Sequence, residues 1–124
     1  MNWTLAIVIG VVFLALLVLK RLAFVSPKVA RRLLAEGALV IDVRSSGEFN
    51  SGHLPAAINI PLGEIETALP RQMKDKSLVL LLHCLSGGCS GIAKRQLKGM
   101  GYSKVYNLGS YGRARQIVQG MHVS

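Results

Sequence analysis

Apolar residues are distributed along the chain in continuous runs and in helical stripes. The longest run, WTLAIVIGVVFLALLVL at residues 3–19, contains no charge. Shorter continuous runs at 38–43 and 78–82 are bounded by turn formers and predict buried strands. Residues 26–37 instead place apolar side chains on one side of a helix that starts at Ser26 and Pro27 and ends at Gly37.

The rest of the chain continues this alternation of helices and strands. The pattern predicts a helical turn at 46–50, an extended AINI segment and a helix over 62–69 that Pro70 ends. It then predicts a helix over 90–100, a strand at 105–108 and a short helix at 114–118. Such alternation is typical of an α/β domain in which helices flank a central parallel sheet, here of about five short strands.

The N-terminal apolar run predicts a single transmembrane helix. Residues 1–25 would form the anchor with its basic flank and 26–124 one domain, because about 100 residues leave no room for two. A cleaved signal peptide would carry its positive charges before the apolar run, and a buried core helix would have a polar face. By the positive-inside rule the domain should face the cytoplasm, since the basic residues all follow residues 3–19: Lys20, Arg21, Lys28, Arg31 and Arg32.

Charge and cysteine content limit the kinds of ligand and partner that the sequence supports. The formal net charge is +9, but from residue 33 onward there are ten basic and six acidic side chains. No array of basic and aromatic residues supports a nucleic-acid partner. The chain has two cysteines, too few for a zinc site, and a reducing compartment would keep them free. No metal is expected.

The segment LHCLSGGCSG at 82–91 carries the strongest chemical signal. It joins a predicted strand to a predicted helix, and ligands of parallel sheets bind beyond the carboxyl ends of the strands. Gly87 and Gly88 allow the main-chain amides to curl around Cys84, and the helix points its positive end there. Such a cradle lowers a thiol pKa and makes the thiolate a nucleophile. The alternative is that Cys84 is a small buried apolar residue.

Three motifs resemble those of the rhodanese-like domain family. The run LVIDVRSSGEFNSGHLPAAINIPL is similar to the N-terminal signature of the family, and LVLLLHCLSGGCS to its active-site strand and six-residue loop. The likeness continues through GYSKVYNLGS and so covers about residues 27–118. The motifs follow in the family's order, and the resemblance implies the rhodanese-like α/β fold.

The resemblance also implies a sulfurtransferase. Cys84 would take sulfur from a donor such as thiosulfate, become a persulfide and pass the sulfur to a thiol or to cyanide, without a cofactor. Asp42 and Arg44 would form a structural ion pair that steadies the neighbouring loops. His53, in the GHLP segment, either fixes its loop or lines the mouth of the site. The persulfide would be held by the active-site loop: Leu85, Ser86, Gly87, Gly88, Cys89 and Ser90.

The loop departs from the family pattern at two positions. Many family loops carry a basic residue where this chain has Leu85 and Cys89, so charge for gripping a dianionic donor is missing from the loop. Arg44 and Arg113 are the candidates to supply it from nearby. Cys89 either fills an amide position of the loop or acts as a resolving thiol that attacks an oxidised or persulfidated Cys84. His83 should point away from Cys84, because neighbouring strand residues face opposite sides.

Two other functions remain open at this point. His-Cys followed by a loop also begins the pattern of cysteine phosphatases and arsenate reductases, but the position of their arginine is occupied here by Ser90. A non-enzymatic redox sensor or binding module would use Cys84 and Cys89 as a dithiol. In either case the anchor would favour a membrane-protein partner.

Overall fold

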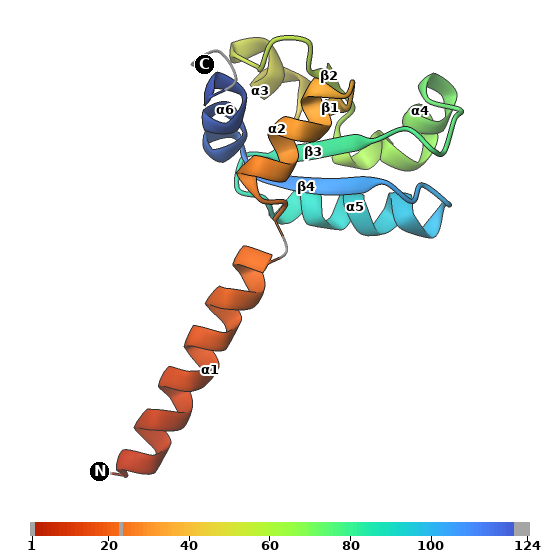
Figure 1. Ribbon diagram of the computed structural model, residues 1–124. Helices are drawn as coiled ribbons and strands as arrows, with labels where there is room; N and C mark the ends of the chain where they lie inside the picture. The colour runs from red at the N-terminus through yellow and green to blue at the C-terminus, as the bar shows by residue number, and fades with distance from the viewer. Residues whose placement is uncertain (1, 23, 121–124) are drawn as a thin grey trace.

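The computed structural model describes residues 2–22 and 24–120 and shows an α/β domain with one projecting helix (Figure 1). Residues 1, 23 and 121–124 lie outside the described residues, so the ends of the predicted segments 1–25 and 26–124 are not described. The projecting helix, α1, covers Trp3–Leu22. The remaining elements form the domain.

The sheet of the domain has four parallel strands in the described part of the chain. They are β1 (Leu39–Asp42), β2 (Ile58–Asn59), β3 (Leu80–Cys84) and β4 (Val105–Ser110), in the order β2-β1-β3-β4. The expectation of a parallel sheet is confirmed, but the expectation of about five strands is wrong. Val25, which precedes the first helix of the domain, donates a single strand-like hydrogen bond to the Asn107 carbonyl (2.8 Å), and Pro27 then starts that helix.

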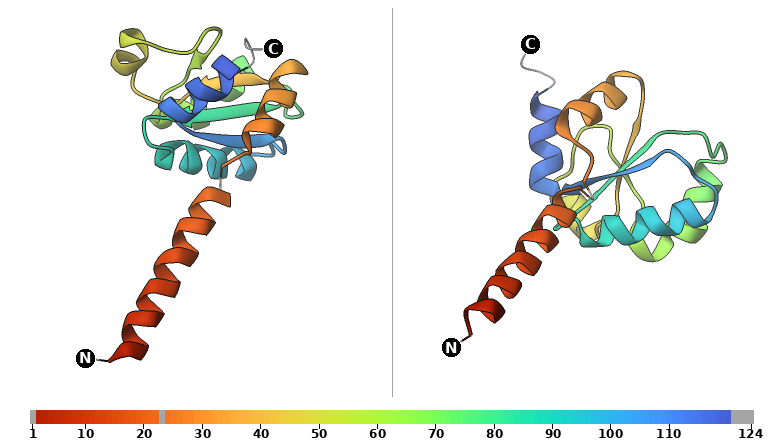
Figure 2. Two further views of the ribbon diagram at one scale, coloured as in Figure 1. Left: turned by 60° about the vertical axis from the view of Figure 1, so that its left-hand side comes forward. Right: turned by 60° about the horizontal axis from the view of Figure 1, so that its bottom comes forward.

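Helices cover both faces of the sheet (Figure 2). One face is covered by α2 (Pro27–Ala35) and α6 (Tyr111–Gln119), and the other by α4 (Ile65–Gln72) and α5 (Gly88–Gly99). A short helix, α3 (Ser46–Ser51), and a 3₁₀ turn, η1 (Leu62–Glu64), connect the strands. The elements therefore follow the order that the apolar pattern predicts.

Two apolar clusters form the core because successive strand residues face opposite sides. Ile41, Leu80 and Leu82 pack with α4 and α5, whereas Val40 and Leu81 pack with α2 and α6. All five side chains are buried. The continuous apolar runs of the sequence are thus strands that are buried on both faces.

Serine side chains begin three of the helices. Ser26, Ser45 and Ser110 each accept a hydrogen bond from a first-turn N–H, of α2, α3 and α6 respectively. One predicted end is wrong: α4 does not stop at Pro70 but includes it and runs to Gln72. Pro70 has no N–H to donate to the carbonyl one turn earlier, and the helix ends soon after it, where the Met73 N–H donates to the Leu69 carbonyl (2.8 Å).

Helix α1 stands apart from the core and is apolar on every side. Its large apolar side chains are between 47% and 80% exposed. Among the helices of the described residues, none combines the length and the apolar character that crossing a membrane requires. The transmembrane helix predicted within residues 1–25 is therefore not supported.

A buried ion pair ties β1 to the loop that follows it. The Asp42 carboxylate is fully buried and accepts hydrogen bonds from the Arg44 side chain (2.8 to 3.1 Å) and from the Arg44 main-chain N–H (2.9 Å). The same guanidinium donates to the Gly52 carbonyl at the end of α3 (2.7 Å) and lies over the Tyr111 ring. The hydrogen bond to Asp42 is the main cause that raises the pKa of Arg44. This pair positions the loop between β1 and β2.

Removing the Asp42 carboxylate should destabilise the domain strongly. In Asp42→Ala the Arg44 charge stays almost buried without its partner, which costs about 3–5 kcal/mol of unfolding free energy. Urea unfolding followed by circular dichroism measures the loss. Glu66→Ala, at an exposed position of α4, is the control and should cost far less. Equal losses in the two variants would contradict the structural role of the pair.

Candidate active site

Cys84 is the last residue of β3 and lies where the chain leaves the sheet for α5. Its side chain belongs to the apolar cluster on the α5 face, and the residue is only 3% exposed. The neighbouring side chain of His83 faces the opposite side of the sheet, beside Tyr111 of α6. The alternation of strand side chains thus turns the thiol, and not the imidazole, toward the start of α5.

The sulfur of Cys84 accepts hydrogen bonds at the N-terminus of α5. The Gly87 N–H lies 2.9 Å from Cys84 Sγ, and the Ser90 N–H lies 3.4 Å from it. The Ser90 hydroxyl is 3.5 Å away but shares its one proton with the Gly87 carbonyl (3.1 Å) and with Asn107 Oδ1 (2.7 Å). The two main-chain N–H groups are therefore the fixed donors to the sulfur.

These donors make the thiol more acidic despite its burial. Burial is the largest single influence and would raise the pKa of Cys84. Hydrogen bonds from the Ser90 side chain and from the N–H groups of Ser90, Gly87 and Ser86 together outweigh it, so that the pKa of Cys84 lies below its ordinary value. A thiolate at this position is stabilised by fixed dipoles that need no rearrangement during a reaction.

Gly87 shapes the turn that directs these amides. It precedes α5 with φ of 94°, a left-handed conformation that favours glycine. A Cβ there would also lie 2.8 Å from the Phe24 ring and 3.2 Å from the main chain of Gly109. The glycine is therefore required both by the conformation of the turn and by the close approach of β4.

Asn107 supports the loop from β4, and no sequence motif had indicated it. Its side chain donates to the Gly87 carbonyl (3.1 Å) and accepts from the Ser90 hydroxyl (2.7 Å) and the Gly109 N–H (2.8 Å). The register of β3 and β4 shifts between Leu82 and His83, so that β4 contains a bulge beside the site. The only signal in the sequence was one polar residue within VYNL.

Three further predicted site residues, Asp42, Arg44 and His53, lie outside the loop that follows Cys84. Asp42 and Arg44 form the ion pair described above, on the strand next to β3. His53 is exposed, stacks on Phe49 (centroids 3.7 Å apart) and bonds through Nδ1 to the Phe49 carbonyl (2.9 Å), contacts that hold its own loop. Their functional roles stay predictions.

His83 is buried without a hydrogen-bond partner. Both of its ring nitrogens lack one among the described residues, and Nε2 lies 3.7 Å from Asp42 Oδ2. Burial is the main cause that lowers the pKa of His83, which favours the neutral ring. Because the ring lies on the face of β3 opposite Cys84, it is not placed to accept the proton of the thiol.

The loop presents its other side chains to the solvent. Leu85 is 64% exposed and Cys89 is also exposed, while Gly88 begins α5. Burial first, and then the charge and the contact of the Cys84 thiol, raise the pKa of Cys89. The two thiols therefore differ in access and in acidity.

Both arginines that were candidates to supply charge to the donor have other partners. Arg44 binds Asp42, and Arg113 donates to the carbonyls of Leu108 and Val25 (2.6 Å each). The structure thus gives both guanidinium groups roles in holding the fold. Within the described residues, no group of three or more histidine, cysteine, aspartate and glutamate side chains is arranged to hold a metal ion.

The fold and the loop geometry agree with a comparison to family models, in which residues 26–112 match the rhodanese-like domain. The chain belongs to this family. The thiosulfate sulfurtransferase PspE of Escherichia coli is 39% identical over 69 residues, which are 56% of this chain and 66% of that protein. The thiosulfate sulfurtransferase GlpE of Pseudomonas savastanoi is 32% identical over 84 residues, 68% of this chain and 77% of that one.

Solved structures support the same rhodanese-like fold. The human single-domain sulfurtransferase TSTD1 superposes with a TM-score of 0.66 at 30% identity and covers 76% of this chain and 96% of its own. A rhodanese with anions from Escherichia coli gives 0.60 at 35% identity, over 62% of this chain and 91% of that one. The α/β fold with a parallel sheet flanked by helices is therefore that of the family.

The role of Ser90 in this rhodanese-like domain can be tested through the acidity of Cys84. In Ser90→Ala the hydroxyl is lost and the main-chain N–H remains, so the pKa of Cys84 should rise, because one of the hydrogen bonds that stabilise the thiolate is gone. The pH dependence of Cys84 alkylation, with the peptide identified by mass spectrometry, measures the shift. Ser103→Ala, at an exposed position, is the control. An unchanged midpoint in Ser90→Ala would exclude the hydroxyl from this role.

Proposed function

We propose that Cys84 accepts a sulfane sulfur as a persulfide from a donor such as thiosulfate and passes it to a thiol or to cyanide. The observation that carries the proposal is the contact of Cys84 Sγ with the N–H groups of Gly87 and Ser90. Membership of the rhodanese-like family and relatives named thiosulfate sulfurtransferases support sulfurtransferase activity. The donor and the acceptor are the parts that the proposal adds.

Each step of the transfer uses the lowered pKa of Cys84. The thiolate attacks the outer sulfur of thiosulfate, the S–S bond of the donor breaks, and sulfite leaves with the bonding electrons. The product, Cys84–S–S⁻, carries its charge at the same turn of main-chain amides. An acceptor thiolate then attacks the outer sulfur, and Cys84 leaves as a thiolate, which is a better leaving group when its pKa is low.

The mouth of the site offers little charge to a dianionic donor. Leu85, Ser86 and Cys89 are the exposed side chains of the loop, and none of them is charged. Leu85 and Cys89 stand at the positions where a basic residue is frequent in the family. Binding of thiosulfate would therefore depend on main-chain amides. For this reason the test of sulfur loading includes a less charged donor, the persulfide of a small thiol.

Sulfur loading should depend on Cys84 alone. Purified protein incubated with either donor should gain the mass of one sulfur atom, removable by a reductant, on the peptide that contains Cys84. Cys84→Ser should gain none, because Cys89 has a raised pKa and lacks the amide turn. Intact-mass and peptide mass spectrometry measure the gain, with Cys89→Ser as the matched thiol variant. Sulfur uptake by Cys84→Ser would contradict the proposal.

A second candidate function is a thiol redox sensor, which the presence of two free cysteines, Cys84 before α5 and Cys89 in its first turn, favours. A peroxide would oxidise the Cys84 thiolate to a sulfenic acid, and Cys89 would condense with it to a disulfide with loss of water. Thiol trapping in cells before and after peroxide discriminates between the candidates. A Cys84–Cys89 disulfide without any persulfide would favour the sensor over the sulfurtransferase.

We also propose that α1 attaches the domain to a membrane, with the domain on the cytoplasmic side. The support is its surface, because a helix that exposes apolar side chains all round is unfavourable in water. The basic residues of the sequence follow the uncharged run at 3–19 and none precedes it, which favours a cytoplasmic domain. A helix with a short uncharged run would require local thinning of the bilayer.

A charge in the middle of α1 should release the protein from membranes. The full chain is expected in the membrane fraction after carbonate washing, and Leu14→Arg should shift most of it to the supernatant, because an arginine at the centre of an inserted helix costs about 3 kcal/mol. Immunoblotting of the fractions measures the shift, with Leu14→Val as the control. Equal distribution of all three proteins would contradict membrane attachment through α1.

A further inference from the structure

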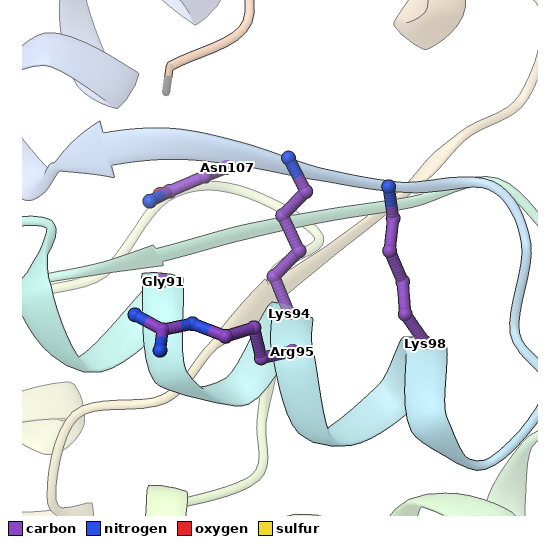
Figure 3. Close-up of a pocket in the computed structure, with 5 residues that line it drawn as sticks. All are labelled: Gly91, Lys94, Arg95, Lys98 and Asn107. Carbon is purple, nitrogen blue, oxygen red and sulfur yellow. The ribbon is translucent and has the colours of Figure 1, made fainter. Parts of the chain in front are cut away.

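A cavity of about 330 Å³ lies between α5 and β4, away from the mouth of the active site. Three basic side chains of α5 and two residues at its inner end line it, and Figure 3 shows their arrangement. We call this cavity, lined by Gly91, Lys94, Arg95, Lys98 and Asn107, the basic cavity. Lys94 and Lys98 extend from α5 toward β4, while the Arg95 guanidinium turns back toward Gly91.

The positive charges of the basic cavity have no carboxylate partner among the described residues. Among the described residues, the carboxylate of Asp42 makes the charge contacts, with Arg44 and with the His83 ring. Neither contact involves a lysine. Lys94 is half-buried, and burial first, then repulsion from Lys98, lowers the pKa of Lys94. Holding these cations together is unfavourable for the free protein, and a bound anion would relieve it.

The inner end of the basic cavity offers hydrogen-bond donors. Asn107 Oδ1 already accepts from the Ser90 hydroxyl and the Gly109 N–H, which fixes the orientation of the amide. Its Nδ2 has two N–H groups, and the structure gives one of them an acceptor, the Gly87 carbonyl. A Cβ at Gly91 would lie 3.5 Å from this Nδ2, so the glycine leaves room beside the amide. Cations and an N–H donor together select an anion.

The basic cavity lies beside the point where the chain enters the domain, and it shares Asn107 with the loop of the active site. The chain enters the domain beside it, because Val25 donates to the Asn107 carbonyl, and α1 leaves the domain at this edge (Figures 1 and 2). The Asn107 side chain also holds Gly87 and Ser90, which donate to Cys84 Sγ. One residue thus contacts both the cavity and the loop that carries the sulfur.

We propose that the basic cavity binds a phosphate group, either free or in a lipid headgroup, and that Asn107 transmits its occupancy to the loop of Cys84. Phosphate matches three cations because it carries up to two negative charges and several acceptor oxygens. A lipid headgroup would reach the cavity where α1 enters the domain. The effect on Cys84 rests on the proposed function, whereas phosphate binding does not.

The binding test compares the full-length protein with the variant Lys94→Gln/Lys98→Gln. Inorganic phosphate, titrated by calorimetry against chloride at equal ionic strength, should bind the wild type at least about tenfold more tightly than the double variant. Vesicles of phosphatidylcholine with phosphatidylglycerol should retain more wild type than neutral vesicles do, and the double variant should lose most of this excess. Lys74→Gln, at an exposed position outside the cavity, should resemble the wild type in both arms.

The two arms identify the source of the phosphate. A difference with inorganic phosphate assigns a free ligand, and a difference only with anionic vesicles assigns the headgroup. If the double variant equals the wild type in both arms, the site is disproved. Circular dichroism of the variants before titration excludes a folding defect.

The coupling to Cys84 has its own readout. A bound anion disfavours a nearby thiolate, so saturating phosphate, or anionic vesicles in the headgroup case, should slow alkylation of Cys84 in the wild type and not in the double variant. Binding without this effect would disprove the role of Asn107. Failure of sulfur loading with phosphate binding intact would disprove the proposed function alone, so the two failures are distinguishable.

Discussion

The structure depends on one hydrogen-bonded contact, in which the sulfur of Cys84 caps the N-terminus of α5. The first N–H groups of any helix lack partners within the helix and need acceptors. Serine hydroxyls meet this need in α2, α3 and α6, but the residue that precedes α5 in the capping position is Gly87, which has no side chain to offer. Cys84 Sγ accepts from Gly87 and Ser90 instead. The interaction that completes the helix is therefore the one that prepares the nucleophile.

This contact requires β3, the loop and β4 to hold accurate positions relative to one another. The left-handed Gly87 turns its N–H toward the sulfur, and the bulge in β4 brings the Asn107 amide to the back of the loop. Asn107 also lines the basic cavity, so a ligand bound in the cavity would contact the residue that supports the loop. The fold thus connects a buried sulfur to two surfaces, the open side of the loop and the basic face of α5.

The apolar pattern was sufficient to predict the order of the elements and the place of Cys84. Buried strands and amphipathic helices have distinct periods, and a glycine pair after a strand indicates a tight turn, so both signals are local in the sequence. The four strands of the described residues coincide with the four extended segments that the apolar pattern marks, so the expected fifth strand had no segment of its own in the sequence. The role of Asn107 depends on a register shift between two distant segments, which the sequence does not encode locally. The partners of Arg113, two main-chain carbonyls, were hidden for the same reason.

The central claim is that main-chain amides hold the Cys84 sulfur as an anion, and a direct titration of that sulfur tests it. The chemical shift of the Cys84 Cβ, followed by nuclear magnetic resonance in protein made with isotope-labelled cysteine, reports the thiolate across a pH series and separates it from Cys89. A midpoint clearly below the value of about 8.5 for a free cysteine is predicted. A midpoint at or above that value would show that burial outweighs the hydrogen bonds and would contradict this account.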